Sequence, residues 1–184
     1  MYGLVNRAIE SMALKAGGEE AWQKIKAKAG ITDPMFLNMQ VYPDQVTYDL
    51  VAAASETLGI SESDVLRGFG KHWILFTSSE GYGDLLDLTG GDLKTFLSNL
   101  NLMHEQVTSS MPELTPPSIE VVELDDQVLE VHYRSKRKGL SDMALGVLEG
   151  LIEKFKVEKE VVQTQFADRG QDHDVFEIRQ LSGG

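Results

Sequence analysis

One change of pattern constrains the fold of this chain more than any other feature. Before the segment MPELTPP, at residues 111–117, apolar side chains recur every three or four positions, which predicts helices. After this segment they alternate with polar side chains, which predicts strands. Its prolines lack the N–H group that a continuing helix requires. The sequence therefore predicts an α+β fold, in which a helical N-terminal subdomain packs on a four-stranded antiparallel sheet crossed by one helix.

The helical half divides at glycines and at capping residues. Gly17 and Gly18 separate a first helix from a second, because glycine weakens a helix interior. Ser61 and Asp64 have the spacing of a capping box, which begins another helix. In chain order the predicted helices run from Met1 to Gly17, from Glu19 to about Ala29, from a cap at Asp44 through Leu58, from Ser61 to the segment SSEGYG, and from Asp92 to about Ser109.

The C-terminal half is predicted to contain two hairpins with a helix between them. The segments IEVVEL and QVLEVHYRSKR are joined by a turn at Asp125 and Asp126. A helix follows from Ser141 to about Lys156, and KEVVQTQF and DVFEIRQL form a second hairpin around RGQD. We expect a single domain of residues 1–184, with a helical subdomain at 1–65 and a second subdomain at 66–184.

Charge and composition exclude several classes of function. The chain has a net charge of −12 and a pI near 4.7, so nucleic acid and anionic membranes would repel it and neither is expected as its main partner. It has no cysteine, which excludes disulfides, thiolate catalysis and cysteine-ligated metals. No apolar run suits a signal peptide or a bilayer span, and we expect a cytoplasmic protein.

Of the four histidines, only His104 falls on an apolar helix face, between Leu100 and Val107. Taken alone, such a histidine is more often a hydrogen-bonded core residue than a ligand. His132 alternates onto the polar face of its strand and His173 lies in an acidic turn, so both are expected to be solvated. The segment HEQVT lacks the second histidine of a zinc peptidase, and no serine lies in a nucleophile elbow. We therefore predict no catalytic residues and no enzyme activity.

Tyr133, Ser135 and Arg137 occupy alternate positions of a predicted strand, so their side chains form a row of donors that can hold an anion. The same spacing also arises where the edge of a hairpin frays into solvent. Leu129 and Val131 precede them on the same face, however, and we expect that Tyr133 faces the interior. Its hydroxyl then needs a polar partner.

A ligand that uses both features would be mostly apolar, carry carboxylates at one edge and offer a metal to a neutral imidazole. Haem has all three properties, because histidine can ligate its iron while arginine and hydroxyl donors bind its propionates. We therefore predict haem between the helical subdomain and the sheet. The alternative is a haem-free domain that binds a protein partner or a small carboxylate, with His104 in its core.

In this order and spacing, Tyr133-x-Ser135-x-Arg137 after a helix bearing His104 resembles the haem-binding H-NOX domain, which is related to the haem domain of soluble guanylate cyclase. The resemblance covers essentially the whole chain, including MYGLVN, PDQVTYDLV, the proline pair of LTPPS, and GLSDMALGVLEGL. It implies haem b, with His104 as the proximal iron ligand and the propionates held by Tyr133, Ser135 and Arg137.

The resemblance also implies roles for residues around the cofactor. Pro117 would press against the porphyrin and distort it, as the family's proline does. Gly70 and Gly146 match glycines about which the helical subdomain pivots. Met1, which lies on the apolar side of the first predicted helix, is expected to point to the interior and to contact the cofactor.

The distal side departs from the oxygen-binding members of the family. These carry a distal tyrosine in the helix after Y-x-S-x-R, whereas no tyrosine follows Tyr133 here and Met143 comes nearest to that position. Trp73 resembles a distal tryptophan of some members, and its indole N–H is a potential donor; a purely structural role in the core is an equal alternative. Oxygen gains more from such a donor than nitric oxide or carbon monoxide, so we expect the latter two as ligands, with oxygen excluded.

The expected function is that of a gas sensor. Nitric oxide weakens the bond trans to it, so we expect His104 to leave the iron and free its helix, which couples gas binding to two packings of the protein. The chain carries no kinase or cyclase motif. The stand-alone bacterial members of the family suggest a histidine kinase or a diguanylate cyclase as the separate effector.

Overall fold

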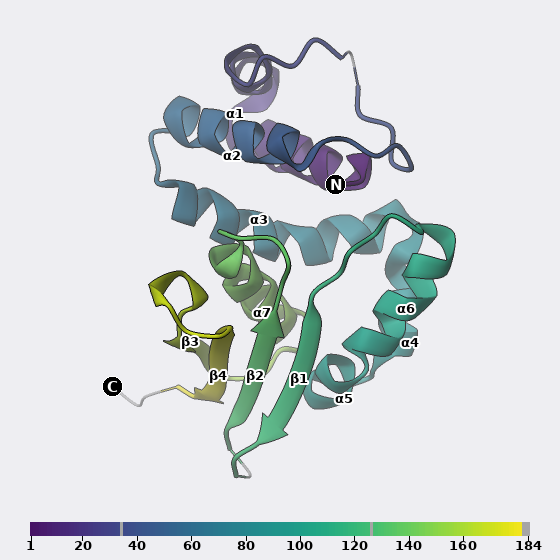
Figure 1. Ribbon diagram of the computed structural model, residues 1–184, viewed down its shortest axis with the longest axis vertical. Helices are drawn as coiled ribbons and strands as arrows, with labels where there is room; N and C mark the ends of the chain where they lie inside the picture. Colours follow the sequence, from purple (N-terminus) through teal and green to yellow (C-terminus); the bar gives the residue numbers. More distant parts are fainter. Residues whose placement is uncertain (34, 126, 182–184) are drawn as a thin grey trace.

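The computed structural model describes residues 1–33, 35–125 and 127–181, so Asp126 of the predicted turn lies outside the described residues. Helices precede the sheet in the chain, and one long helix lies between its two hairpins (Figure 1). The helical elements are α1 (Gly3–Lys28), α2 (Asp44–Leu58), α3 (Glu62–Thr77), η1 (Ser78–Tyr82), α4 (Gly83–Thr89), α5 (Leu93–Ser98), α6 (Leu100–Ser110), α7 (Ser141–Phe155) and η2 (Ala167–Arg169). The strands are β1 (Ser118–Glu123), β2 (Leu129–Arg134), β3 (Lys159–Gln165) and β4 (Asp174–Gln180).

The four strands form one antiparallel sheet in the order β1-β2-β4-β3, so the predicted α+β fold is confirmed. Each hairpin pairs internally, and the two hairpins join through β2 and β4, where Val131 lies opposite Phe176. Both of these side chains are buried, on the face of the sheet that the helices cover. No helix in the described residues is long and apolar enough to cross a membrane.

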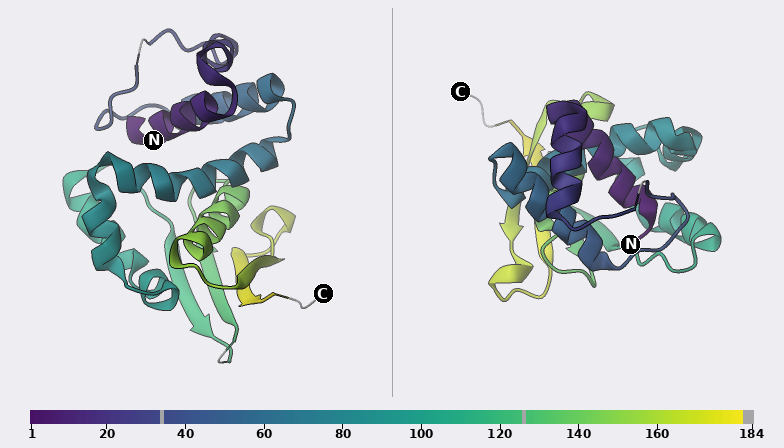
Figure 2. Two further views of the ribbon diagram at one scale, coloured as in Figure 1. Left: turned by 180° about the vertical axis from the view of Figure 1, so that it is seen from behind. Right: turned by 90° about the horizontal axis from the view of Figure 1, so that it is seen from above.

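The helices form two layers above and beside the sheet. In Figures 1 and 2, α1 and α2 lie at one end of the molecule, α3 crosses below them, and α7 lies between α3 and the sheet. The shorter helices α4, α5 and α6 stand together beside β1. This arrangement leaves α6 facing α3 and the sheet from one side of the molecule.

The helical half differs from the sequence-based expectation at two places. The long helix predicted from 92 to 109 is divided at Asn99, whose side chain donates to the backbone carbonyl of Thr89 at 2.8 Å. Asparagine competes with helix continuation through such bonds. Nothing in the sequence pattern indicated α4, which begins at the end of SSEGYG and is too short for a periodic signal. The predicted break at Gly18 is confirmed by its non-helical φ of 70° within α1.

The starts of α2 and α3 show one correct and one incorrect capping prediction. The hydroxyl of Ser61 accepts from the backbone N–H of Asp64 at 3.1 Å, as a capping box requires. Asp44, predicted as a cap, is instead the first residue of α2, and its carboxylate makes no capping bond. That carboxylate is used in tertiary contacts described below.

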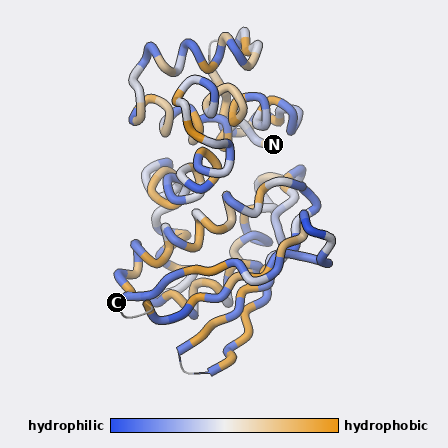
Figure 3. Tube along the Cα trace, turned by 90° about the vertical axis from the view of Figure 1, so that its left-hand side faces the viewer, coloured by the Kyte–Doolittle hydropathy of each residue, from blue (hydrophilic) through white to orange (hydrophobic). Residues whose placement is uncertain are grey.

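Two hydrophobic cores meet at α3. One lies among α1, α2 and the start of α3; the other lies between α7 and the sheet, with α5 at its side. The half-buried Trp73 packs against both. Figure 3 shows the hydrophobic stretches of the strands and helices separated by hydrophilic turns. The side chain of Trp73 therefore lies where the two parts of the protein join.

Glycines allow α3 and α7 to cross with their backbones in contact. A Cβ atom on Gly70 would lie 2.1 Å from the carbonyl oxygen of Met143, and one on Gly146 would lie 2.0 Å from that of Arg67. Only a residue without a side chain fits at either position. Beside this contact, Glu149 of α7 pairs with Arg67 and Lys71 of α3. The crossing is thus closely packed at its centre and held by ion pairs at its edge.

Candidate cofactor-binding site

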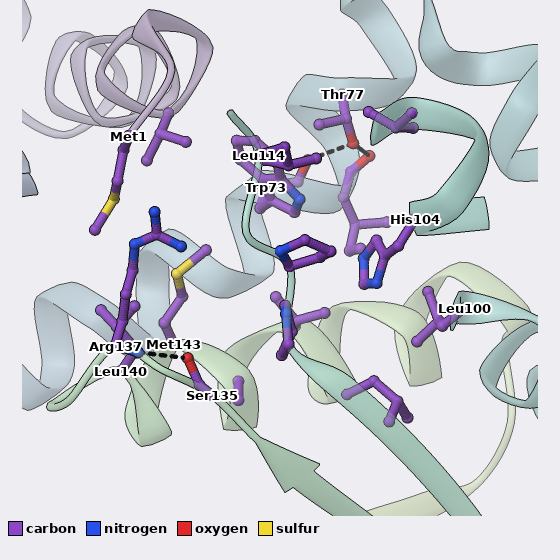
Figure 4. Close-up of a pocket in the computed structure, with 18 of the residues that line it drawn as sticks. Met1, Trp73, Thr77, Leu100, His104, Leu114, Ser135, Arg137, Leu140 and Met143 are labelled. Atoms are coloured by element: carbon purple, nitrogen blue, oxygen red, sulfur yellow. Dashed lines mark hydrogen bonds between the residues drawn. The ribbon is translucent and has the colours of Figure 1, made fainter. Parts of the chain in front are cut away.

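A mostly apolar cavity of about 300 Å³ opens between the two cores (Figure 4). Its walls come from the start of α1, from α2, α3, α6 and α7, and from the segment that leads into β1 and the end of β2. Its volume is in the range of small-molecule and cofactor sites. All eight predicted site residues line it: Met1, Trp73, His104, Pro117, Tyr133, Ser135, Arg137 and Met143. The fold therefore brings together residues that are distant in the sequence.

The apolar face of α6 is turned toward this cavity, and it packs against the two cores only in part, through Val107 and Leu100. No residue of α6 is buried, although Leu100, Met103, His104 and Val107 all line the cavity. A helix with an apolar face normally buries that face against protein. The partly uncovered apolar face of α6 thus indicates a place for an apolar ligand.

His104 presents an imidazole with an unsatisfied nitrogen. Its Nδ1 atom is fully buried and makes no hydrogen bond of normal geometry within the described residues. Burial lowers the pKa of His104, and the backbone carbonyl of Pro117 opposes this effect in part. A neutral imidazole is the form that ligates a metal, and a carbonyl beside it is the usual orienting partner. The position of His104 is therefore suited to a metal ligand.

Tyr133, Ser135 and Arg137 lie together, although not all on a strand as predicted. β2 ends at Arg134, so Ser135 and Arg137 belong to the bend that follows. Burial still alternates along the chain beyond the end of the strand: Tyr133, Ser135 and Arg137 are partly buried, whereas Arg134 and Lys136 are exposed. The hydroxyl of Ser135 accepts from the backbone N–H of Arg137 at 3.1 Å, and this bond replaces the strand pairing in fixing the bend.

The hydroxyl of Tyr133 remains a donor over the whole neutral range. Burial raises its pKa, while the hydroxyl of Ser135 acts in the opposite direction. Ser135 thus interacts with the side chain of Tyr133 and with the backbone of Arg137. The three residues form a compact set of donors at one edge of the cavity.

Arg137 is held in place by two partners that the sequence did not indicate. Its Nε atom donates to Asp44 of α2 at 2.7 Å, and its Nη1 atom donates to the backbone carbonyl of Thr115 at 2.7 Å. Asp44 also accepts from the N-terminal amine of Met1 at 2.6 Å. Burial acts to raise the pKa of Asp44, but the bonds from the amine and from Arg137 outweigh it and lower the pKa. Asp44 therefore links the first helices to the bend after β2.

The cavity has two chemically different sides. Figure 4 shows His104 and Leu100 projecting from α6 on one side, and Met1 and Arg137 on the other. Met143 lies near Ser135, and Trp73 lies toward the middle of the cavity. A flat ligand between these sides would meet an imidazole on its face and donors at its edge.

His132 and His173 are not simply solvated as predicted. The exposed fractions of their side chains are 19% and 11%, and their rings are hydrogen-bonded to each other. Neither lines the cavity. Within the described residues, no three His, Asp or Glu side chains could hold a metal ion together. A single imidazole, by contrast, is enough for an axial bond to haem iron.

Haem fits the residues present. The imidazole of His104 could supply a donor to the iron, the apolar walls could accept a porphyrin, and Arg137 with two hydroxyls could supply donors for carboxylates. The family model described as Haem-NO-binding matches residues 2–163. This chain belongs to that family. It is a family of haem-binding gas sensors, and the domain itself is a sensor module without a catalytic site.

Curated relatives of this Haem-NO-binding chain include cyclases. Soluble guanylate cyclase 89Db of Drosophila melanogaster is 28% identical over 155 residues, which cover 84% of this chain and 23% of that protein. Soluble guanylate cyclase gcy-32 of Caenorhabditis elegans is 27% identical over 195 residues, which cover 99% and 28%. This chain spans about a quarter of the length of such relatives.

Solved structures of the family share the whole fold. A triple mutant of an H-NOX protein from S. oneidensis in the Fe(II) state superposes with a TM-score of 0.90 at 20% identity, covering 100% of this chain and 98% of that one. The same protein in the Fe(II)NO state gives a TM-score of 0.86 at 20% identity, with coverage of 99% and 100%. An oxygen-binding H-NOX domain in its oxygen complex gives 0.79 at 22% identity, with coverage of 97% and 94%. At these identities the comparison establishes the fold.

Proposed function

We propose that this chain is a haem-based sensor of nitric oxide and carbon monoxide, in which His104 is the axial ligand of the iron. The observation that carries the proposal is the buried imidazole nitrogen of His104, which lacks a normal hydrogen bond and lies in a mostly apolar cavity. An unsatisfied buried polar atom costs free energy, and a metal bond removes that cost. The cytoplasm is the expected location.

The bound cofactor is haem b, held without a covalent link. The chain has no cysteine, so the thioether attachment of c-type haem is not open to it. Tyr133, Ser135 and Arg137 bind the propionates at the edge of the cavity. In this role the two bonds of Arg137 to Asp44 and Thr115 orient its guanidinium. They use its Nε and Nη1 atoms, and we expect the Nη2 donors to serve a propionate.

Selectivity against oxygen follows from the side chains around the gas. Ferrous haem supplies an open coordination position that a diatomic gas can occupy. Met143 provides no hydrogen-bond donor at the place where oxygen-binding members have a tyrosine, and nitric oxide and carbon monoxide need such a donor far less than oxygen does. Trp73 lines the cavity and packs against both cores, which supports a structural role for its ring.

The signal is a change in the packing of α6 and of the N-terminal subdomain. His104 would hold the iron of the cofactor, and a gas bound to that iron would weaken this hold. Because α6 has no buried residue of its own, it would then be able to move. Pro117, which lines the cavity, would contact the porphyrin, and residues 1–65 would shift against residues 66–184 about Gly70 and Gly146. Asp44 and Arg137 carry the movement between the two parts. A separate effector, a histidine kinase or a diguanylate cyclase, receives it.

Replacement of His104 by glycine tests the proposal. His104→Gly removes the imidazole, so we expect a changed spectrum of the ferrous protein and its recovery when free imidazole is supplied. Glu105→Gly is the matched control, because it introduces the same glycine on the neighbouring exposed position of α6. An unchanged ferrous spectrum in His104→Gly would refute the assignment of the ligand.

A further inference from the structure

A chain of four titratable side chains lies outside the cavity, on β2 and in the turn before β4. Glu130 and His132 belong to β2, whereas Asp172 and His173 lie in the turn before β4. His132 Nε2 lies 2.7 Å from a carboxylate oxygen of Glu130, and His173 Nδ1 lies 2.9 Å from one of Asp172. The remaining nitrogens, His132 Nδ1 and His173 Nε2, are 2.7 Å apart. All four ring nitrogens are therefore engaged.

The two rings meet head-on. Their centroids are 5.0 Å apart, a separation equal to the nitrogen–nitrogen distance plus the two ring radii, so the facing nitrogens lie almost on the line between the centroids. Two lone pairs that chelate a metal must instead converge on a point off this line. The geometry is that of a linear N–H···N hydrogen bond, which holds a proton and excludes a chelated metal ion.

The number of protons follows from the four partners. An ionised carboxylate can only accept, so Glu130 needs an N–H from His132 and Asp172 needs one from His173. The bond between His132 and His173 needs a third proton. Two neutral imidazoles carry only two, and the observed contacts therefore require one proton more, shared between the two rings.

The charged groups on the neighbouring strands have partners of their own. Glu120 of β1 lies opposite His132 in the sheet, but it pairs with Arg134 at 3.1 Å, and these two charges compensate each other. On β4, Val175 is the residue opposite His132. The carboxylate of Asp174 accepts from Ser141, from Gln163 and from the backbone N–H of Ala167, so it is committed elsewhere.

One positive charge on the pair thus faces two carboxylates, those of Glu130 and Asp172. Further along β4, Glu177 lies opposite Glu130 and is 3.8 Å from Arg179. Lys136, beyond the end of β2, is exposed. None of these groups competes for the facing ring nitrogens.

We propose that His132 and His173 share a single proton and form a proton-operated clamp between β2 and the turn before β4. Loss of the proton at alkaline pH leaves two lone pairs facing each other, and gain of a second at acidic pH brings two N–H groups together; either opens the clamp. The clamp lies beside Tyr133, which is opposite Asp174 in the sheet. A change in pH would therefore alter the packing at the end of β2, next to the anion-binding residues Tyr133, Ser135 and Arg137.

Nitrogen-15 NMR of the histidine rings tests the proposal. The full chain is titrated between about pH 5 and pH 8, the interval in which histidine changes charge. We expect His132 and His173 to titrate together in two coupled steps, with three ring N–H groups on the plateau between them. In His173→Gln, whose amide can still donate to His132, one of the two steps is lost and His132 titrates in a single step.

His72 is the internal control, because its partner Ser11 lies in α1 and its titration should be the same in both proteins. A second measurement compares melting temperatures: the gap between wild type and His173→Gln is largest on the plateau and shrinks at both pH extremes. Independent single-step titration of the two wild-type rings, or a gap that does not vary with pH, would overturn the proposal. Neither readout uses a haem signal, so the result does not depend on His104.

Discussion

Replacement of Gly70 by alanine tests the contact on which the two halves of the cavity depend. A Cβ atom there would lie 2.1 Å from the carbonyl oxygen of Met143 and 2.6 Å from the backbone nitrogen of Val147, well inside the 3.4 Å at which ordinary contact begins. Both atoms belong to the backbone of α7, so α3 must move away. Overpacking of this kind costs about 1–3 kcal/mol. The helix propensity of alanine returns about 1 kcal/mol.

The matched control is Gly68→Ala on the same helix. Its Cβ atom would have Met12 Sδ as nearest neighbour at 3.9 Å, so only the propensity gain of about 1 kcal/mol applies. In thermal unfolding, with 1 kcal/mol shifting the midpoint by roughly 2–4 °C for a chain of this size, we expect Gly68→Ala to unfold above wild type and Gly70→Ala several degrees below it. Equal midpoints for the two variants would show that α3 does not approach α7 as the structure has it.

Three further predictions concern the cavity and the residues that hold it. Met143→Tyr should acquire a stable spectrum in air that Met143→Phe lacks, because only the tyrosine adds a donor; absorption spectra in air decide this, and equal spectra would contradict it. Arg137→Ala should lose haem to a competing haem acceptor faster than Arg134→Ala, because the side chain of Arg134 is exposed. Equal rates of loss would count against propionate binding by Arg137. Because the pKa of Asp44 is lowered in the folded protein, its contribution to stability is present above pH 3.8 and is lost as the pH falls below that value. The difference in unfolding free energy between wild type and Asp44→Asn, measured by denaturant titration, should therefore close in acid. A difference that stays constant with pH would contradict this.

Periodicity was sufficient to predict the elements that bury one face. The alternation of Leu129, Val131 and Tyr133 placed the last of these toward the interior, and helical spacing placed His104 with Leu100. Both predictions rest on which side of an element is apolar, a property that neighbouring residues determine. The sequence could therefore indicate which side chains line the cavity, and the family resemblance indicated what the cavity holds.

Contacts between distant segments could not be predicted in this way. Arg137 and Asp44 are separated by 93 positions, and any of 29 acidic residues offers the same carboxylate chemistry. The hydrogen bond between His132 and His173 depends on the conformation of a turn, and a turn has no periodic residue pattern from which that conformation could be predicted. The division of the predicted long helix at Asn99 similarly depends on a tertiary bond to Thr89. Hydrogen-bond partners that only the tertiary fold brings together cannot be identified from the periodicity of the sequence.

An absorption spectrum of the purified chain tests the central claim most directly. The protein is reduced without oxygen and then exposed separately to air and to nitric oxide. We predict a Soret band that air changes only by slow oxidation and that nitric oxide shifts as the bond to His104 is lost. A new and stable spectrum in air would contradict the exclusion of oxygen, and the absence of a Soret band from protein made in haem-replete cells would favour a haem-free binding domain.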